Sequence, residues 1–138
     1  MEDWQRLFVG VMNVCKNSLG QTSVSKLGPL SLNRREVMPK GYWIVRVDVT
    51  DHEQFKLYMA AAVDPLKRHG ARFLVRAGRF ENPEGQTRSR NTVIEFPSYE
   101  AAVECWQSLE YQQAVRMRQP ASTMDLVIIE GYEGPQPS

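Results

Sequence analysis

The sequence predicts an α+β domain with the ferredoxin-like order βαββαβ, in which two helices cover one face of a four-stranded antiparallel sheet. Three observations lead to this prediction. Alternating runs typical of strands begin near residues 40, 72, 90 and 124. Apolar residues at helical spacing follow the first and third runs. Strong turn chemistry, Asn-Pro-Glu-Gly at 82–85, joins the second run to the third.

The first strand, residues 40–49, has large apolar or aromatic side chains on both faces. One face carries Trp43, Val45 and Val47, and the other Tyr42, Ile44, Arg46 and Asp48.

A capping box, Thr50 with Glu53, predicts that the first helix begins there, and Gly70 closes it. Pro65 removes a helical N–H donor, so we expect a kink or a break into two pieces at that residue. The apolar stripe of this helix is Phe55, Tyr58, Met59, Ala62 and Leu66.

Residues 72–81 and 90–96 are expected to form an antiparallel hairpin. Ser98 caps a second helix, and 111–118 add a shorter helical turn. The last strand is expected at 124–132, before a tail at 135–138. Two helices can cover only one sheet face, which leaves a second apolar face that favours a homodimer. This open face is expected to contain Tyr42, Ile44, Leu74, Val93, Leu126 and Ile128.

The composition argues against nucleic acids and anionic membranes as partners. The 138 residues contain 17 basic and 16 acidic side chains, so there is no global field to attract nucleic acid or an anionic membrane. Cys15 and Cys105 lie far apart and lack metal-ligand spacing, which favours a reducing cytoplasm. We expect no metal and no other cofactor, because no glycine-rich phosphate loop or cluster of metal ligands occurs.

Residues 1–37 show no sustained period and are interpreted as an N-terminal extension to a domain at 38–134. Two explanations are open. The segment is either a flexible arm or the product of a misassigned start codon, with translation beginning at Met38.

Residues 40–132 resemble a bacterial family of domains of unknown function, DUF1330, within the superfamily of dimeric α/β barrels. The likeness rests on KGYW at 40–43, GARFLVRAGRFE at 70–81, VIEFPSYEAA at 93–102 and DLVIIEG at 125–131. Ala71 and Ala77 stand where the family pattern has glycines. The resemblance implies the ferredoxin-like fold and a dimer, and it favours the later start. It implies no chemistry, since the superfamily includes cofactor-free oxygenases, haem enzymes and non-catalytic members.

The candidate site lies on the open face, where four strands each contribute one charge: Arg46, Arg76, Glu95 and Glu130. Charges among apolar neighbours must pair if they are buried. We therefore expect a pocket between the sheet and its partner for a small anionic or carbonyl metabolite. Arg76 and Arg46 would hold a carboxylate or enolate, Glu95 would act as base, and Tyr42 and Glu130 would complete the binding site.

The alternative is a non-catalytic dimerisation or ligand-sensing module, in which the same charges form a salt-bridged interface. A haem-binding protein is a third hypothesis, with little support because the only histidines, His52 and His69, lie at helix ends. The sequence leaves open whether the protein is an enzyme.

Overall fold

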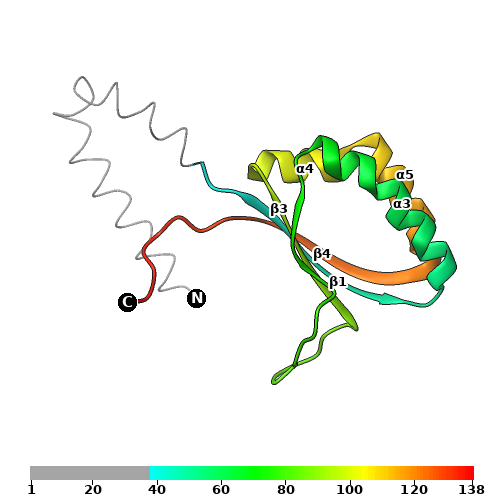
Figure 1. Cartoon of the computed structure of the whole chain (residues 1–138), viewed down its shortest axis with the longest axis horizontal. Coiled ribbons are helices and arrows are strands. Elements are labelled where there is room, and N and C mark those ends of the chain that lie inside the picture. The colour runs from blue at the N-terminus through cyan, green and yellow to red at the C-terminus, as the bar shows by residue number, and fades with distance from the viewer. Residues whose placement is uncertain (1–37) are drawn as a thin grey trace. The chain divides into compact units, whose positions relative to one another are not determined.

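The computed structural model describes residues 38–138, and Pro39–Ser138 form one compact unit. The expectations for residues 1–37 lie outside the described residues. Figure 1 shows the elements in chain order. They are β1 (Gly41–Val49), α3 (His52–Arg68), β2 (Arg72–Arg76), β3 (Arg90–Phe96), α4 (Tyr99–Gln107), α5 (Leu109–Arg118), the 3₁₀ turn η2 (Gln119–Ala121) and β4 (Ser122–Glu130).

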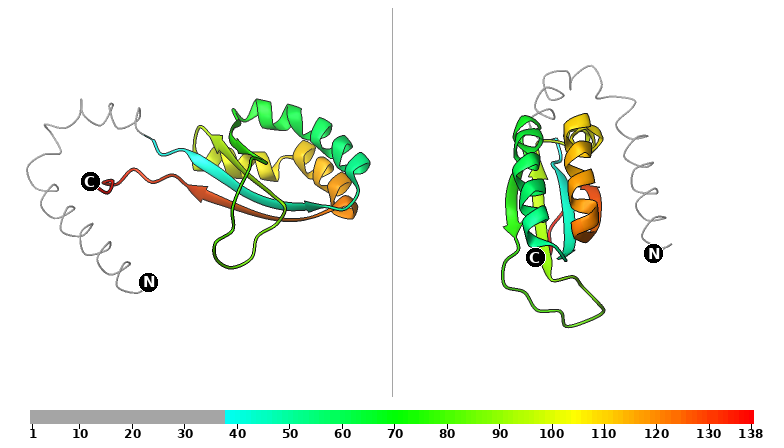
Figure 2. Two further views of the ribbon diagram at one scale, coloured as in Figure 1. Left: turned by 60° about the horizontal axis from the view of Figure 1, so that its bottom comes forward. Right: turned by 90° about the vertical axis from the view of Figure 1, so that its right-hand side faces the viewer.

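The predicted α+β fold is confirmed. All pairings in the four-stranded sheet are antiparallel, and the strand order is β2-β3-β1-β4. The three helices lie on one side of the sheet, and the long connection between β2 and β3 extends away from them (Figures 1 and 2). The other face of the sheet is not covered by the described residues.

The core forms where the central strand β1 faces the helices. Trp43 is only 1% exposed, and its indole N–H donates to the Ala102 carbonyl on α4 (3.0 Å). Its ring also contacts Phe96 and Tyr111, with centroids 4.9 Å away in each case. One side chain thus fixes both α4 and α5 on the sheet, because a buried indole needs a hydrogen-bond acceptor as well as apolar neighbours.

The helix boundaries differ from the predictions in three places. The N-cap of α3 is Asp51, whose carboxylate accepts from the Gln54 N–H (3.1 Å), so the cap lies one residue after Thr50. The helix is not broken at Pro65, which lies in its last turn and is buried. The separate helical segment expected at 111–118 is α5, which begins earlier, at Leu109, because Ser108 has an extended conformation and caps its start.

Strand parity differs from the prediction in β4. Ile128 lies opposite Trp43 and Leu126 opposite Val45, and both pack against the core. Directly opposed residues share a sheet face, so placing these two on the open face was wrong. Val127 and Ile129 lie there instead, opposite Ile44 and Tyr42. The run from Leu126 to Ile129 is apolar at every position, so its alternation does not reveal which side faces the core.

The close approach of β1 to α4 requires glycine at position 41. A Cβ there would overlap the Ser98 carbonyl oxygen and lie 2.7 Å from the Tyr99 Cα. We expect Gly41→Ala to reduce the free energy of unfolding by about 2 kcal/mol or more, because backbone atoms must move. Urea denaturation measures this. Gly78→Ala is the matched control, since a Cβ at that position meets nothing within 4 Å. Equal stabilities of the two variants would contradict the packing argument.

Candidate functional site

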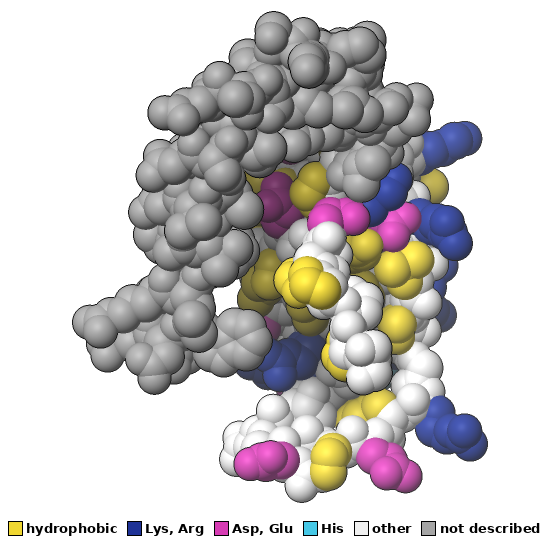
Figure 3. Space-filling model, turned by 90° about the vertical axis from the view of Figure 1, so that its left-hand side faces the viewer, with side chains coloured by type: hydrophobic (Ala, Val, Ile, Leu, Met, Phe, Trp, Pro, Cys, Tyr) yellow, Lys and Arg dark blue, Asp and Glu magenta, His cyan; other side chains and the backbone are white. Residues whose placement is uncertain are grey.

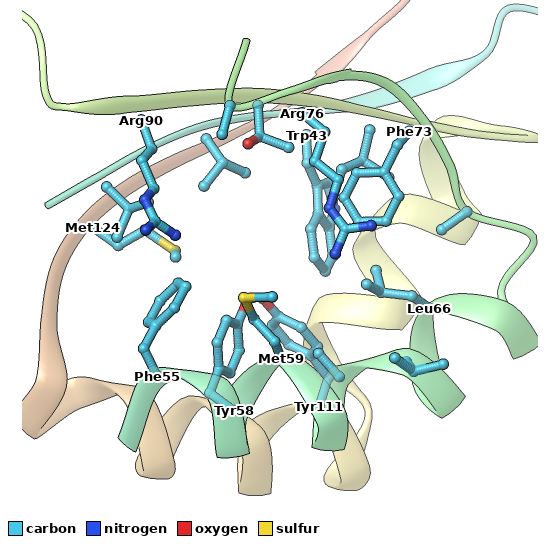
Figure 4. A pocket seen from close by; sticks show the side chains of 18 of the residues that line it. Trp43, Phe55, Tyr58, Met59, Leu66, Phe73, Arg76, Arg90, Tyr111 and Met124 are labelled. Atoms are coloured by element: carbon cyan, nitrogen blue, oxygen red, sulfur yellow. The ribbon is translucent and has the colours of Figure 1, made fainter. Parts of the chain in front are cut away.

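A cavity of about 500 Å³ lies between α3 and the helix-facing side of the sheet. Figure 4 shows aromatic and aliphatic side chains of α3 on one side and strand residues on the other. The helix contributes Phe55, Tyr58, Met59, Ala62, Val63 and Leu66. This cavity lies on the face of the sheet opposite to the one where the pocket between sheet and partner is predicted.

Small side chains leave this space open. Ala62 on α3, Thr92 on β3, and Ala71 and Ala77 at the ends of β2 all line the cavity. The edge strand β2 is only 5 residues long, so the sheet ends early on this side. A layer of short side chains beside a short edge strand cannot fill the gap that larger residues fill near Trp43.

A β-bulge places Arg76 in the cavity. Phe73 pairs with Ile94 and Val75 with Val93, so Leu74 is an extra residue on β2. Arg76 then pairs with Thr92, on the helix-facing side of the sheet. Its guanidinium lies over the Phe73 ring, 4.5 Å from the centroid. Simple alternation had assigned Arg76 to the open face, and the bulge makes that assignment wrong.

Arg90 is the second guanidinium of the cavity. It lies opposite Val47, two residues from Thr92 on the same face of β3, which makes it a diagonal neighbour of Arg76. Diagonal neighbours are about 7–8 Å apart, within reach of long side chains. Figure 4 shows both arginines extending from the sheet side into the cavity, and Arg90 lies 5.8 Å from the centroid of the Phe55 ring.

The charges in this cavity are of one sign. Lys67 joins the two arginines in the lining, which contains no Asp, Glu, His or Cys from the described part of the chain. Neither Arg76 nor Arg90 forms an ion pair within residues 38–138. Two neighbouring cations without a counter-ion repel each other, and solvent screens part of that repulsion because Arg76 is exposed and Arg90 half-buried. An anion would be complementary to this charge.

The helix side supplies a pair of phenols. The hydroxyls of Tyr58 and Tyr111 are 2.8 Å apart, and both side chains line the cavity. Burial raises the pKa of Tyr111 far above that of a free phenol, and the neighbouring Tyr58 raises it further. Tyr111 is therefore a neutral hydrogen-bonding group at any physiological pH, not a phenolate base.

The structure does not assemble the predicted charge cluster. Arg46 and Glu95 lie on the open face, whereas Arg76 and Glu130 lie on the helix-facing side. Glu130 is exposed at the end of β4, opposite Gly41, and does not line the cavity.

Tyr42 and Glu95 do meet on the open face. The Tyr42 hydroxyl donates to Glu95 Oε2 (3.2 Å). Burial raises the pKa of Tyr42, and the bond to Glu95 adds to the shift. The catalytic role predicted for Glu95 would have to operate on this face, away from Arg76. These positions do not test the catalytic and binding roles predicted for the individual residues.

Arg88 organises the other end of the open face. Its guanidinium donates to Asp125 (2.7 Å) and to Asp48 (3.0 Å), and Asp48 also accepts from the Ser89 N–H (2.8 Å). These bonds lower the pKa of both carboxyls, through Ser89 and then Arg88 at Asp48 and through Arg88 at Asp125. This ion-pair group ties the end of the β2–β3 loop to β1 and β4.

Sequence reasoning missed Arg90, Tyr58 and Tyr111 as site residues. The alternation along β3 indicates the position of Arg90, because it places Arg90 on the same face of the strand as Thr92 and Ile94. Nothing in the sequence indicates that the two tyrosine hydroxyls meet, because they come from different helices.

Among the described residues, 38–138, no helix is long and apolar enough to cross a membrane. They also contain no group of three or more His, Cys, Asp or Glu side chains placed to hold a metal ion. Figure 3 shows hydrophobic side chains interspersed with basic and acidic ones on one side of the molecule. The cytoplasmic location and the absence of nucleic-acid partners stay predictions.

The sequence profile described as "Domain of unknown function (DUF1330)" matches residues 40–132. The chain belongs to this family. Two solved structures of one protein of unknown function, RPA0582 from Rhodopseudomonas palustris, are similar to it at 18% identity, with TM-scores of 0.57 and, for the methylated form, 0.59. The matches cover 78% and 79% of this chain and 95% and 94% of that one. They support the shared ferredoxin-like fold.

A weaker similarity is to SnoaB, a cofactor-independent oxygenase from Streptomyces nogalater. It has 11% identity and a TM-score of 0.48, and covers 70% of this chain and 96% of SnoaB. A search of curated proteins found none that matches the chain.

The backbone at Ala77 holds the end of the bulged strand in place. Ala77 has a φ of 49°, in the left-handed region, while its N–H donates to the Asn91 carbonyl (2.9 Å). Because a Cβ is disfavoured there, we expect Ala77→Gly to raise the free energy of unfolding by about 1 kcal/mol. Ala71→Gly, at ordinary φ, should instead lower it by about 0.5–1 kcal/mol. Denaturant melts of the two variants measure this, and stabilisation by both or by neither would contradict the assignment of strain to Ala77.

Proposed function

We propose that this DUF1330 protein binds a small organic anion with an apolar body in the cavity between α3 and the sheet. The observation that carries the proposal is the pair of guanidinium groups, Arg76 and Arg90, in a cavity whose described lining has no carboxylate. A salt-bridged structural cluster would have its cations paired, so this arrangement favours ligand binding over the module alternative in which all charges are neutralised.

The arrangement has a definite chemical capacity. Two arginines at a diagonal spacing can hold a carboxylate with charge-assisted hydrogen bonds, or stabilise the charge that develops on an enolate. The apolar remainder of the cavity suits a ring or a branched chain. Apart from the arginines and the neutral Tyr111, the titratable groups among the described lining residues are Lys67 and Tyr58. The site therefore supports binding more strongly than it supports any one reaction.

A thermal-shift experiment tests the proposal. The full chain is melted with carboxylates, keto acids and phenols, each paired with its neutral amide or methyl ether. A carboxylate at about 100 times its Kd should stabilise the folded state by about 2.7 kcal/mol and raise Tm by roughly 10 °C, while the neutral partner should not. No response to any anion would overturn the proposal.

Charge-removing variants locate the site. We expect Arg76→Gln and Arg90→Gln each to weaken binding of the best carboxylate by about tenfold or more, because each removes a charge-assisted hydrogen bond. Arg79→Gln is the matched control, since Arg79 is exposed on the loop and does not line the cavity. Isothermal titration calorimetry gives the three affinities. Unchanged affinity in both pocket variants would place the anion elsewhere.

We also propose that a second copy of the chain covers the open face. Its middle contains Ile44, 41% exposed, and Val127, 50% exposed, beside Val93 and Val75. Flanking this apolar band, the arginines Arg46, Arg72 and Arg88 are balanced by Asp48, Glu95 and Asp125. A surface with balanced charges around an apolar centre can meet an identical surface without net repulsion, as a two-fold interface requires.

Sedimentation equilibrium tests the homodimer at micromolar concentration. Ile44→Lys places a cation at the centre of the apolar band and should produce a monomer. Leu57→Lys adds the same charge on α3, at a side chain that is 53% exposed, and should leave the dimer intact. A monomeric wild-type protein, or an Ile44→Lys variant that stays dimeric, would exclude this interface.

A further inference from the structure

One of the two tyrosine O–H donors in the cavity has no acceptor in the described chain. Each phenol carries one donor, and a mutual hydrogen bond uses only one of the two. Within residues 38–138 no other acceptor bonds either hydroxyl. Tyr111 is 1% exposed and Tyr58 9%, so both side chains are buried against the cavity. A buried donor without an acceptor is costly and is normally satisfied.

Either phenol can donate in the mutual hydrogen bond, and the other O–H is then left without an acceptor among the described residues. Tyr58 is the less enclosed of the two side chains, at 9% exposed against 1% for Tyr111, so its hydroxyl is the one that a ligand in the cavity reaches more easily. In Figure 4 the Tyr58 and Tyr111 rings converge beside Met59, on the side of the cavity that faces the two arginines.

A buried cation strengthens this donor. The Arg118 guanidinium lies 5.6 Å from the centroid of the Tyr58 ring, and its Nε has no hydrogen-bond partner in the described chain. Arg118 does not line the cavity. A positive charge near the ring strengthens the phenol as a hydrogen-bond donor, and a hydrogen bond accepted from Tyr111 by its oxygen would polarise it further.

We propose that the ligand of this cavity is bifunctional, with an anionic group bound by Arg76 and Arg90 and a carbonyl oxygen that accepts from the Tyr58 hydroxyl. The inference rests on the proposed anion site and names its substrate class, which is aromatic oxo-carboxylates. The charge is supplied from the sheet and the neutral donor from α3, so the two groups of the ligand must stand at opposite ends of an apolar body. The aromatic body follows from the Phe55, Tyr58 and Met59 side chains that line the helix side.

Matched ligand pairs test the carbonyl contact. 4-Acetylbenzoate and 4-isopropenylbenzoate have nearly the same shape and the same carboxylate, but only the first has the carbonyl oxygen. The corresponding phenylacetates and cinnamates extend the carboxylate-to-carbonyl distance. Calorimetry of the full-length protein should find, at one of the three lengths, that the acetyl compound binds about tenfold more tightly than its isopropenyl partner.

Two conservative variants assign the donor. In Tyr58→Phe the tenfold preference should fall to less than twofold, while the isopropenyl compound should bind as in the wild type. In Tyr111→Phe, where the Tyr58 hydroxyl persists, most of the preference should remain. Circular dichroism melts of both variants establish that they are folded.

The outcomes separate the two proposals. If carboxylates bind but the members of every pair bind equally, the inference fails and the anion site stands. A preference that survives in folded Tyr58→Phe also overturns the inference. If no carboxylate binds at any length, the anion site fails and the inference fails with it.

Discussion

The burial of Trp43 at the centre of β1 is the constraint on which the rest of the domain depends. Its indole N–H must reach an acceptor, and the Ala102 carbonyl on α4 provides one at 3.0 Å. That bond and the ring contact with Tyr111 set the height of α4 and α5 above the sheet. Tyr111 in turn positions the Tyr58 hydroxyl through their hydrogen bond. The polar group on the helix side of the cavity is thus held by a chain of contacts that begins in the core.

The cavity is the part of the same layer that large side chains do not fill. Aromatic rings occupy the space around Trp43, whereas small residues such as Ala62 and Thr92 line the cavity. There the two guanidinium groups lie against aromatic faces in place of carboxylates. A cation–π contact contributes about 0.5–2 kcal/mol and leaves the N–H donors of the guanidinium unused. Arg76 and Arg90 are therefore partly stabilised without a ligand yet still able to bind an anion.

Most of the fold could be predicted from the sequence, because hydrophobic period and capping residues mark β1, β3 and the helices directly. Two features could not. The apolar run in β4 is compatible with either face, and only pairing with Trp43 and Val45 decides it. The bulge at Leu74 moves Arg76 to the opposite face of the sheet, and no residue type in β2 indicates that a bulge occurs there. The predicted site therefore contained one residue of the cavity, Arg76, and assigned it to the wrong face.

The bulge has a consequence for how the two faces are related. Because Leu74 is an extra residue, Val75 lies on the open face and the adjacent Arg76 lies in the cavity. Within the described chain β2 pairs only with β3, so it is held on one side. A molecule packed against Val75 would restrict the motion of this edge strand, and the orientation of Arg76 depends on the strand. A partner on the open face would thus reduce the conformational freedom of Arg76, and so lower the entropic cost of binding an anion on the other side of the sheet.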